Sequence, residues 1–243
     1  MLPRACAYAP AVQYNPAQHE ASAQCEENDC MPTVLSPPEA RVILHSISWS
    51  LYEQLLAEHE EKSSPRFAYD RGELEITVPS YEHEELNRLI NDFIVVIAME
   101  WNVEYCNAGS TTFKREDLER GFEPDSCFYV QRAGQIAGKK RLDLTVDPPP
   151  DLVLEVDITH PWLDKLSIFA AVGVPEVWRY DDERVRMLAL TGDSYVEREQ
   201  SLAFPALRSA HLVELLAASQ QMPRTAWLRH VRAWAQTQAG VGN

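Results

Sequence analysis

Two periodicities of hydrophobic and polar residues run along this chain. Between residues 86 and 97, hydrophobic residues recur every three or four positions, which predicts a long helix that begins at Ser80. Residues 73–78 alternate between polar and apolar, which predicts a strand with one face toward solvent. The turn 70–72 joins this strand to the apolar run 67–69. These segments therefore predict a β-hairpin followed by an amphipathic helix.

Shorter patterned segments flank this unit on both sides. Ser50 and Glu53 form a capping box, which predicts a helix from residue 50 to about 61. Apolar runs bounded by Gly and Pro residues predict strands, and longer runs with helical spacing predict helices. The expected strands span residues 103–106, 111–114, 126–130, 142–146, 152–156, 176–180, 187–190 and 195–199, and the expected helices span residues 162–172, 212–217 and 224–238. This order predicts an α/β (α+β) fold, in which helices flank a mixed sheet.

Composition divides the chain into three expected parts. Residues 1–40 are rich in proline and show no periodicity, so they cannot bury enough apolar surface and are expected to form a disordered tail. Residues 41–205 carry the strands and most of the helices, and are expected to form the globular domain. Residues 206–243 are expected to form a helical C-terminal extension, because their hydrophobic residues follow helical spacing.

The net charge of −15 limits the class of partner. Proteins that coat nucleic acids gain affinity when Lys and Arg side chains neutralise phosphates, so this charge argues against that class. An acidic chain can still act on DNA if its basic residues line one groove. Residues 139–141, Lys-Lys-Arg, are a candidate for contact with the DNA backbone, although a solvated turn explains them equally well.

The cysteines and the apolar runs bear on the cellular compartment. None of the five cysteines belongs to a Cys-x-x-Cys pair, and residues 1–11 lack the basic start and the apolar core of a signal peptide. We therefore expect reduced thiols in a cytoplasmic protein. No apolar run approaches the roughly 18 residues that a transmembrane helix requires, so no membrane partner is expected.

Three charged residues indicate chemistry near the ends of the strands. Glu155 lies inside the apolar strand expected at 152–156, where a carboxylate is costly to bury unless a partner compensates its charge. Asp125 begins another apolar run, and Lys165 lies in the helix that follows Glu155. Phosphodiester hydrolysis needs a cation that neutralises the phosphate, an activated water and a group that stabilises the developing charge. Two carboxylates suit a Mg²⁺ or Mn²⁺ ion, so these residues predict a metal-dependent phosphodiester hydrolase.

The same residues resemble the PD-(D/E)XK nuclease superfamily. Pro124-Asp125 matches the first half of its motif and Glu155 the second, but Asp157 stands where the motif has its lysine. The Uma-type restriction endonuclease family of bacteria is a branch that commonly carries this lysine on the next helix. This chain is similar to that branch over roughly residues 45–205. The matching segments are Gly72-Glu73-Leu74, His83-Glu84, Glu155-Val156, Lys165 and the run Gly-Val-Pro-Glu-Val-Trp at 173–178.

The resemblance implies both a fold and a function. The fold is a restriction-endonuclease-like mixed sheet flanked by helices, and the function is cleavage of DNA by an endonuclease that depends on Mg²⁺ or Mn²⁺. Asp125 and Glu155 would then hold the metal, and Lys165 would orient or deprotonate the attacking water. A homodimer would allow one site per chain to cut both strands of a duplex.

Several of these residues admit a second interpretation. Asp157 either adds a third metal ligand or caps the following loop. Glu84 either lies near the metal or serves as an acid at a helix N-terminus. We expect His83 to be a surface histidine, and His160 to be either a solvated loop residue or a substrate contact.

Two other functions are open from the sequence. If Glu155 and Lys165 form only a structural ion pair, the chain is a catalytically inactive nuclease-fold module that binds a protein or a nucleic acid. The departure at Asp157 and the negative net charge favour this alternative. A metal-dependent hydrolase that acts on another phosphate ester is the second alternative.

Overall fold

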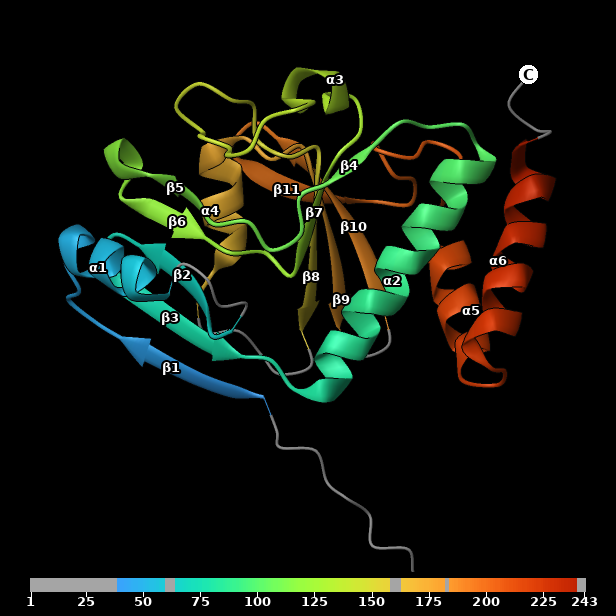
Figure 1. Cartoon of the computed structure of the whole chain (residues 1–243), viewed down its shortest axis with the longest axis horizontal. Helices are drawn as coiled ribbons and strands as arrows, with labels where there is room; N and C mark the ends of the chain where they lie inside the picture. Colours follow the sequence, from blue (N-terminus) through green and yellow to red (C-terminus); the bar gives the residue numbers. More distant parts are fainter. Residues whose placement is uncertain (1–38, 60–63, 158–162, 182–183, 240–243) are drawn as a thin grey trace, which may run out of the picture. The chain divides into compact units, whose positions relative to one another are not determined.

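The computed structural model describes residues 39–59, 64–157, 163–181 and 184–239 (Figure 1). Every described residue belongs to a single compact unit. Most of the tail expected at 1–40 therefore lies outside the described residues, whereas Ala40 already begins a strand. Within the described residues, the strands form two sheets.

The first sheet is antiparallel and has five strands. Its order is β1 (Ala40–Leu44), β3 (Glu73–Val78), β2 (Arg66–Asp70), β6 (Arg120–Phe122) and β5 (Phe113–Arg115). The predicted hairpin is confirmed as β2 and β3, whose register pairs Tyr69 with Leu74. Helix α1 (Trp49–His59) contributes Trp49 and Tyr52 to a hydrophobic cluster with these two residues, so it covers this sheet (Figure 1).

The second sheet is mixed and has six strands. Its order is β11 (Ser194–Arg198), β10 (Arg184–Thr191), β9 (Glu176–Asp181), β8 (Leu152–Asp157), β7 (Ser126–Tyr129) and β4 (Cys106–Asn107). Strands β8 and β9 pair in parallel, and helix α4 (Lys165–Val172) lies between them in the chain, as parallel neighbours require. The prediction of a mixed sheet flanked by helices is confirmed. The sequence pattern predicted a single sheet, and did not indicate that β1, β2, β3, β5 and β6 form a second, antiparallel sheet.

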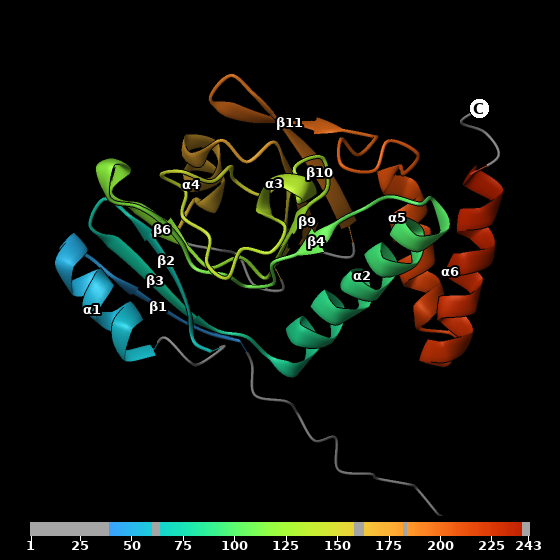
Figure 2. The ribbon, with the colours of Figure 1, turned by 45° about the horizontal axis from the view of Figure 1, so that its top comes forward.

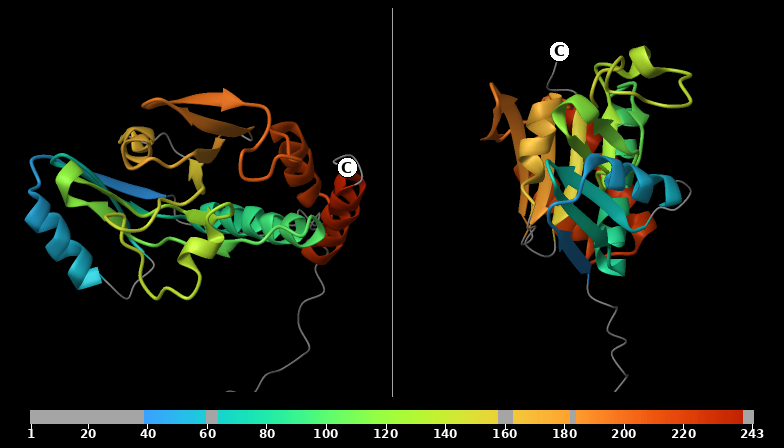
Figure 3. Two further views of the ribbon diagram at one scale, coloured as in Figure 1. Left: turned by 90° about the horizontal axis from the view of Figure 1, so that it is seen from above. Right: turned by 90° about the vertical axis from the view of Figure 1, so that its left-hand side faces the viewer.

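Helices cover both faces of the mixed sheet. The other helices are α2 (Tyr81–Glu100), α3 (Ala133–Ile136), α5 (Ser209–Ser219), α6 (Arg224–Ala239) and the short 3₁₀ helix η1 (Glu116–Leu118). Helices α2, α5 and α6 pack with Leu152 and Leu154 of β8 into one hydrophobic core. Figure 2 shows these three helices gathered on one side of the sheet. Helix α4 packs with Val153 on the other face. Figure 3 shows α4 on the opposite side of the mixed sheet from α2. Because side chains alternate along a strand, Glu155 also faces α4.

The prediction of a strand at 142–146 is wrong, because this segment forms turns. The carboxylate of Asp147 accepts a hydrogen bond from the Asp143 N–H at 2.9 Å and another from the Lys139 amine. Asp143 in turn accepts hydrogen bonds from the N–H and the hydroxyl of Thr145, at 2.9 and 2.7 Å. Such bonds from side chains to nearby backbone compete with the ladder of a sheet, and apolar patterning does not reveal them.

Two predicted helix ends are confirmed, the start at Ser80 and the end at Gly173. Ser80 caps α2, since its hydroxyl oxygen accepts the His83 N–H, and Gly173 ends α4 in the left-handed conformation at φ 81°. The predicted strand at 103–106 is reduced to Cys106–Asn107. None of the helices in the described part of the chain combines the length and the apolarity that a membrane span requires.

Gly121 of β6 provides a test of this packing. A Cβ atom at this position would lie 2.8 Å from the ring carbons Cε1 and Cζ of Tyr52. Tyr52 is fully buried and stacks on Tyr69 with ring centroids 4.8 Å apart, so it has little room to move. Gly121→Ala is therefore expected to lower the free energy of unfolding by about 1–3 kcal/mol, measured by urea denaturation.

Gly134→Ala is the matched control for this substitution. No atom lies within 4 Å of a Cβ at Gly134, which is exposed in α3, so this variant is expected to unfold at the midpoint of the wild type or above it. Equal midpoints for Gly121→Ala and the wild type would show that the Tyr52 ring is not tightly packed.

Candidate active site

Asp125, Glu155 and Lys165 lie together on one face of the mixed sheet. Strands β7 and β8 pair antiparallel, in a register that sets Asp125 opposite Glu155 when it is extended by one residue. The N–H of Val156 donates to Asp125 Oδ2 at 2.6 Å, which ties the start of β7 to β8. Alternation along the two strands turns both carboxylates toward α4, whose first residue is Lys165.

Lys165 forms an ion pair with Glu155. Its Nζ lies 2.8 Å from Glu155 Oε2 and 4.0 Å from Glu75 Oε1. Burial, together with the charges of Asp125 and Asp157, raises the pKa of Glu155 above its usual range despite the nearby amine. Burial by itself lowers the pKa of Lys165, but the surrounding carboxylates outweigh it and raise this pKa. The amine of Lys165 therefore stays protonated at neutral pH.

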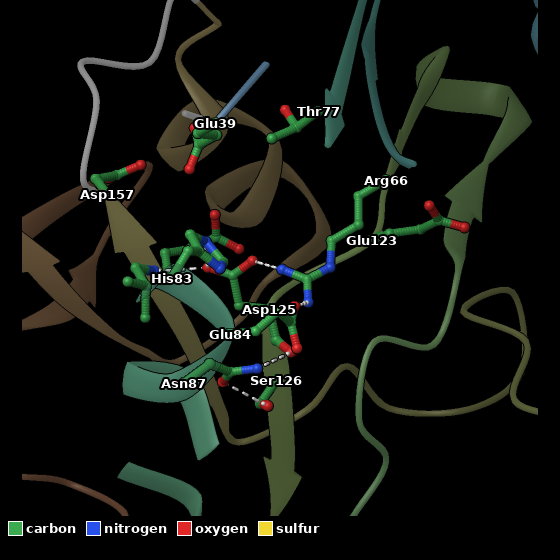
Figure 4. A network of polar contacts seen from close by, with 12 residues as sticks. Glu39, Arg66, Thr77, His83, Glu84, Asn87, Glu123, Asp125, Ser126 and Asp157 are labelled. Carbon is green, nitrogen blue, oxygen red and sulfur yellow. Dashed lines mark hydrogen bonds and ion pairs between the residues drawn. The ribbon is translucent and has the colours of Figure 1, made fainter. Parts of the chain in front are cut away.

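Asp125 is held from several sides (Figure 4). Its Oδ1 accepts a hydrogen bond from Arg66 Nη1, and its Oδ2 lies 3.1 Å from His83 Nε2. Asn87 Nδ2 donates to the main-chain carbonyl of Asp125 at 3.1 Å. Burial alone would raise the pKa of Asp125, but the His83 hydrogen bond and the Arg66 charge hold it well below its usual range. Asp125 therefore carries a negative charge at neutral pH.

Glu84 and Asp157, the two further candidate ligands, have different surroundings. Glu84 Oε1 accepts a hydrogen bond from Arg66 Nη2, so one guanidinium bridges Glu84 and Asp125 (Figure 4). Asp157 pairs instead with Arg179 of the neighbouring strand, at 2.5 Å. Of these two candidates, Glu84 is the one that shares a hydrogen-bond partner, Arg66, with Asp125. The loop that Asp157 was expected to cap, and His160 within it, belong to residues 158–162, outside the described residues.

The prediction that His83 is a surface histidine is wrong. Its side chain is only 3% exposed, because the first turn of α2 lies against the start of β7. Burial lowers the pKa of His83, but the hydrogen bond to Asp125 and the charge of Asp125 raise it overall. An acidic first turn indicates exposure to water only when no other segment packs against it. The start of β7 packs against this turn, and the local sequence around His83 gives no sign of that contact.

Sequence reasoning missed the buried charges of Arg66 and Glu75. Their exposed fractions are 7% and 0%, although Glu75 lies on the hairpin face that was predicted to be solvated. Glu75 Oε2 accepts the N–H of Leu163 at 3.3 Å, and its Oε1 lies 3.5 Å from Arg41 Nη1. These partners come from distant parts of the chain, so the alternation within β3 gives no sign of them.

The two opposed carboxylates fit a divalent cation in one respect. Glu155 Oε1 is buried and has no hydrogen-bond partner among the described residues. The described residues contain no group of three or more His, Cys, Asp or Glu side chains arranged around a metal position. Mg²⁺ is commonly bound by one or two carboxylates, with water and substrate phosphate completing its shell. Asp125 and Glu155 would match that small set of protein ligands.

Comparisons with known proteins place these observations in a wider context. A family model, Uma2, described as "Putative restriction endonuclease", matches residues 49–223. A solved structure of a putative nuclease of DUF820 from Anabaena variabilis is 13% identical in sequence, with a TM-score of 0.45. The match covers 75% of this chain and 99% of that chain. No curated protein matches the chain.

Proposed function

This chain belongs to the Uma2 family, whose description is putative restriction endonuclease, and we propose that it is a divalent-metal-dependent endonuclease that hydrolyses DNA phosphodiester bonds. The observation that carries the proposal is the meeting of Asp125 and Glu155 on one face of the mixed sheet, with the Lys165 amine 2.8 Å from Glu155. Buried carboxylates beside a cationic side chain are typical of sites that handle phosphate chemistry.

Asp125 and Glu155 would hold a Mg²⁺ or Mn²⁺ ion. When bound, such an ion neutralises the scissile phosphate and lowers the pKa of a water molecule. Arg66 and His83 fix the carboxylate of Asp125 in place. Lys165 is protonated, so it acts as a hydrogen-bond donor that orients the attacking water and stabilises the charge that develops on phosphate, rather than as a base.

Incubation of the full chain with supercoiled plasmid tests the proposal directly. We expect conversion to the open circular form in the presence of Mn²⁺ or Mg²⁺, and no conversion when a chelator removes the ion. A wild-type protein that binds Mn²⁺ but nicks no plasmid would contradict the nuclease function. A parallel assay with a small aryl phosphate ester separates DNA cleavage from hydrolysis of other phosphate esters. Sedimentation of the active protein tests the homodimer that double-strand cleavage favours.

One observation favours the alternative of a catalytically inactive binding module. Asp125 pairs with Arg66 and Glu155 with Lys165, so both carboxylates already have cationic partners without a metal. Calorimetric titration with Mn²⁺ discriminates between the two functions. The endonuclease is expected to release or absorb heat at a saturable site that Glu155→Gln removes, whereas the inactive module is expected to show no such site.

The affinity for Mn²⁺ is expected to rise with pH. The raised pKa of Glu155 means that a proton competes with the ion at and below neutral pH, whereas the lowered pKa of Asp125 keeps that ligand ionised. Below the pKa of Glu155 the affinity should fall by up to about tenfold per pH unit. Titrations at about pH 6 and about pH 8 measure this slope. Glu155→Gln should show no saturable Mn²⁺ binding at either pH. Binding in that variant with an equal pH slope would assign the pH dependence to another group.

A further inference from the structure

A polar cavity lies beside Asp125, which forms part of its lining, whereas Lys165 does not. Its volume is about 520 Å³, which lies within the range of pockets that hold small molecules. Helix α2 lines it with Asn87, Arg88 and Asn91, strand β7 with Ser126, and strand β4 with Asn107. Three side-chain amides thus meet in one cavity next to a proposed metal ligand.

The polar side chains of this cavity form one chain of hydrogen bonds. Asn107 Nδ2 donates to Asn91 Oδ1 at 2.8 Å, and Asn91 Nδ2 donates to Ser126 Oγ at 2.9 Å. Ser126 Oγ donates to Asn87 Oδ1 at 2.9 Å, and Asn87 Nδ2 donates to the carbonyl of Asp125 at 3.1 Å. The chain therefore fixes the orientation of each amide and ends on Asp125.

Asn107 and Asn91, at the outer end of these linked hydrogen bonds, each retain an unused hydrogen-bonding group that a ligand could contact. Asn107 Nδ2 carries two hydrogens, of which Asn91 takes one, and Asn91 Oδ1 has two lone pairs, of which Asn107 takes one. The remaining donor and acceptor lie beside each other. A donor next to an acceptor matches the edge of a nucleobase, as the two groups of a single Asn amide do with adenine. Here the donor comes from Asn107 and the acceptor from Asn91.

The charges around the cavity favour a neutral ligand group over a second phosphate. Arg66 is already shared between Asp125 and Glu84, and Asp92 pairs with Arg224 at 2.8 Å. Arg88 lies 3.9 Å from Glu84 with its side chain 77% exposed, which places it at the rim. The charged side chains of the cavity are therefore paired or lie at its rim, so the amides are the groups that remain for a ligand.

We infer that this cavity binds the nucleobase that flanks the scissile phosphate, with Asn91 and Asn107 in contact with the base edge. Asn87 and Ser126 are positioning residues that orient the amides of Asn91 and Asn107. The inference rests on the proposed endonuclease function, because it takes the phosphate at Asp125 and Glu155 as its reference point. It adds a base preference at one position beside the cut.

Cleavage of duplex oligonucleotides of random sequence in Mn²⁺ tests this inference. Sequencing of the cleaved ends gives the frequency of each base at every position around the cut. We expect one position beside the cut to show a preference of about fivefold or more in the wild type, the lower range for one bidentate amide contact. Asn107→Ala and Asn91→Ala should both flatten that preference while they continue to cleave.

Gln236→Ala is the matched control. Its amide is exposed on α6 and donates to Glu100 at 2.9 Å, so the variant removes a hydrogen-bonded amide that does not line the cavity. This control should keep the wild-type preference. Melting curves for all variants verify folding, and the exposed position of Asn107 makes its variant usable even if Asn91→Ala unfolds.

The outcomes separate this inference from the proposed function. Cleavage by the wild type without any base preference, or a preference that both asparagine variants retain, would overturn the inference and leave the nuclease function intact. Absence of all cleavage by the wild type would remove the nuclease function, and the base-binding role would fall with it.

Discussion

Asp125→Asn is expected to reduce Mn²⁺-dependent nicking of supercoiled plasmid by about a thousandfold or more, because it removes one of two charges proposed to hold the ion. The substitution keeps the size of the side chain and an oxygen that can accept the Val156 N–H. It removes the negative charge that faces Arg66 and His83. The rate of conversion to open circular plasmid measures the effect, and the Mn²⁺ titration should lose its saturable site.

Asp147→Asn is the control for this loss of a buried, ion-paired aspartate. The side chains of Asp125 and Asp147 are each 4% exposed, and Asp147 likewise accepts hydrogen bonds from a cationic side chain, that of Lys139, and from a backbone N–H. Both variants are expected to lose stability, but only Asp125→Asn should lose nicking. Folded Asp125→Asn protein that nicks at the wild-type rate would exclude Asp125 as a metal ligand.

Lys165→Met is expected to reduce nicking by about a hundredfold while the protein still binds Mn²⁺. The substitution removes the protonated amine beside Glu155 but keeps an unbranched side chain that fills the same space. Loss of this cation releases Glu155 from its ion pair but also raises its pKa further, so binding is measured at alkaline pH, where the proton competes least with the ion. Calorimetry at about pH 8 and plasmid nicking at the same pH separate binding from catalysis.

Lys114→Met is the control for Lys165→Met. Lys114 also pairs with a glutamate, Glu53, at 2.6 Å, but its side chain is 48% exposed and lies in the antiparallel sheet. We expect this control to nick at the wild-type rate. If Lys165→Met lost Mn²⁺ binding together with nicking, Lys165 would be required to build the site rather than to orient the water.

The local pattern of the sequence was sufficient for the elements that carry the site. Alternation between polar and apolar residues predicted the β2–β3 hairpin, and the Ser80 cap with helical spacing predicted α2. The carboxylate of Glu155 inside an apolar strand was conspicuous because burial of a charge needs compensation. The structure places Lys165 against it, and places Asp125 directly before the adjacent strand β7. Their catalytic role is still a prediction.

The sequence by itself determined the periodicities, the Ser80 cap and the unusual position of Glu155, because each depends on residues within a few positions of one another. The cap expected at Ser50 was wrong, because Ser48 caps α1 and Ser50 lies inside that helix. Only the tertiary structure decided that Glu75 is buried, that His83 contacts Asp125, and that Arg66 joins Asp125 to Glu84. Exposure and ion pairing depend on which segment packs against a face. Glu75 and Leu163, for example, are 88 residues apart, so no local pattern contains the information.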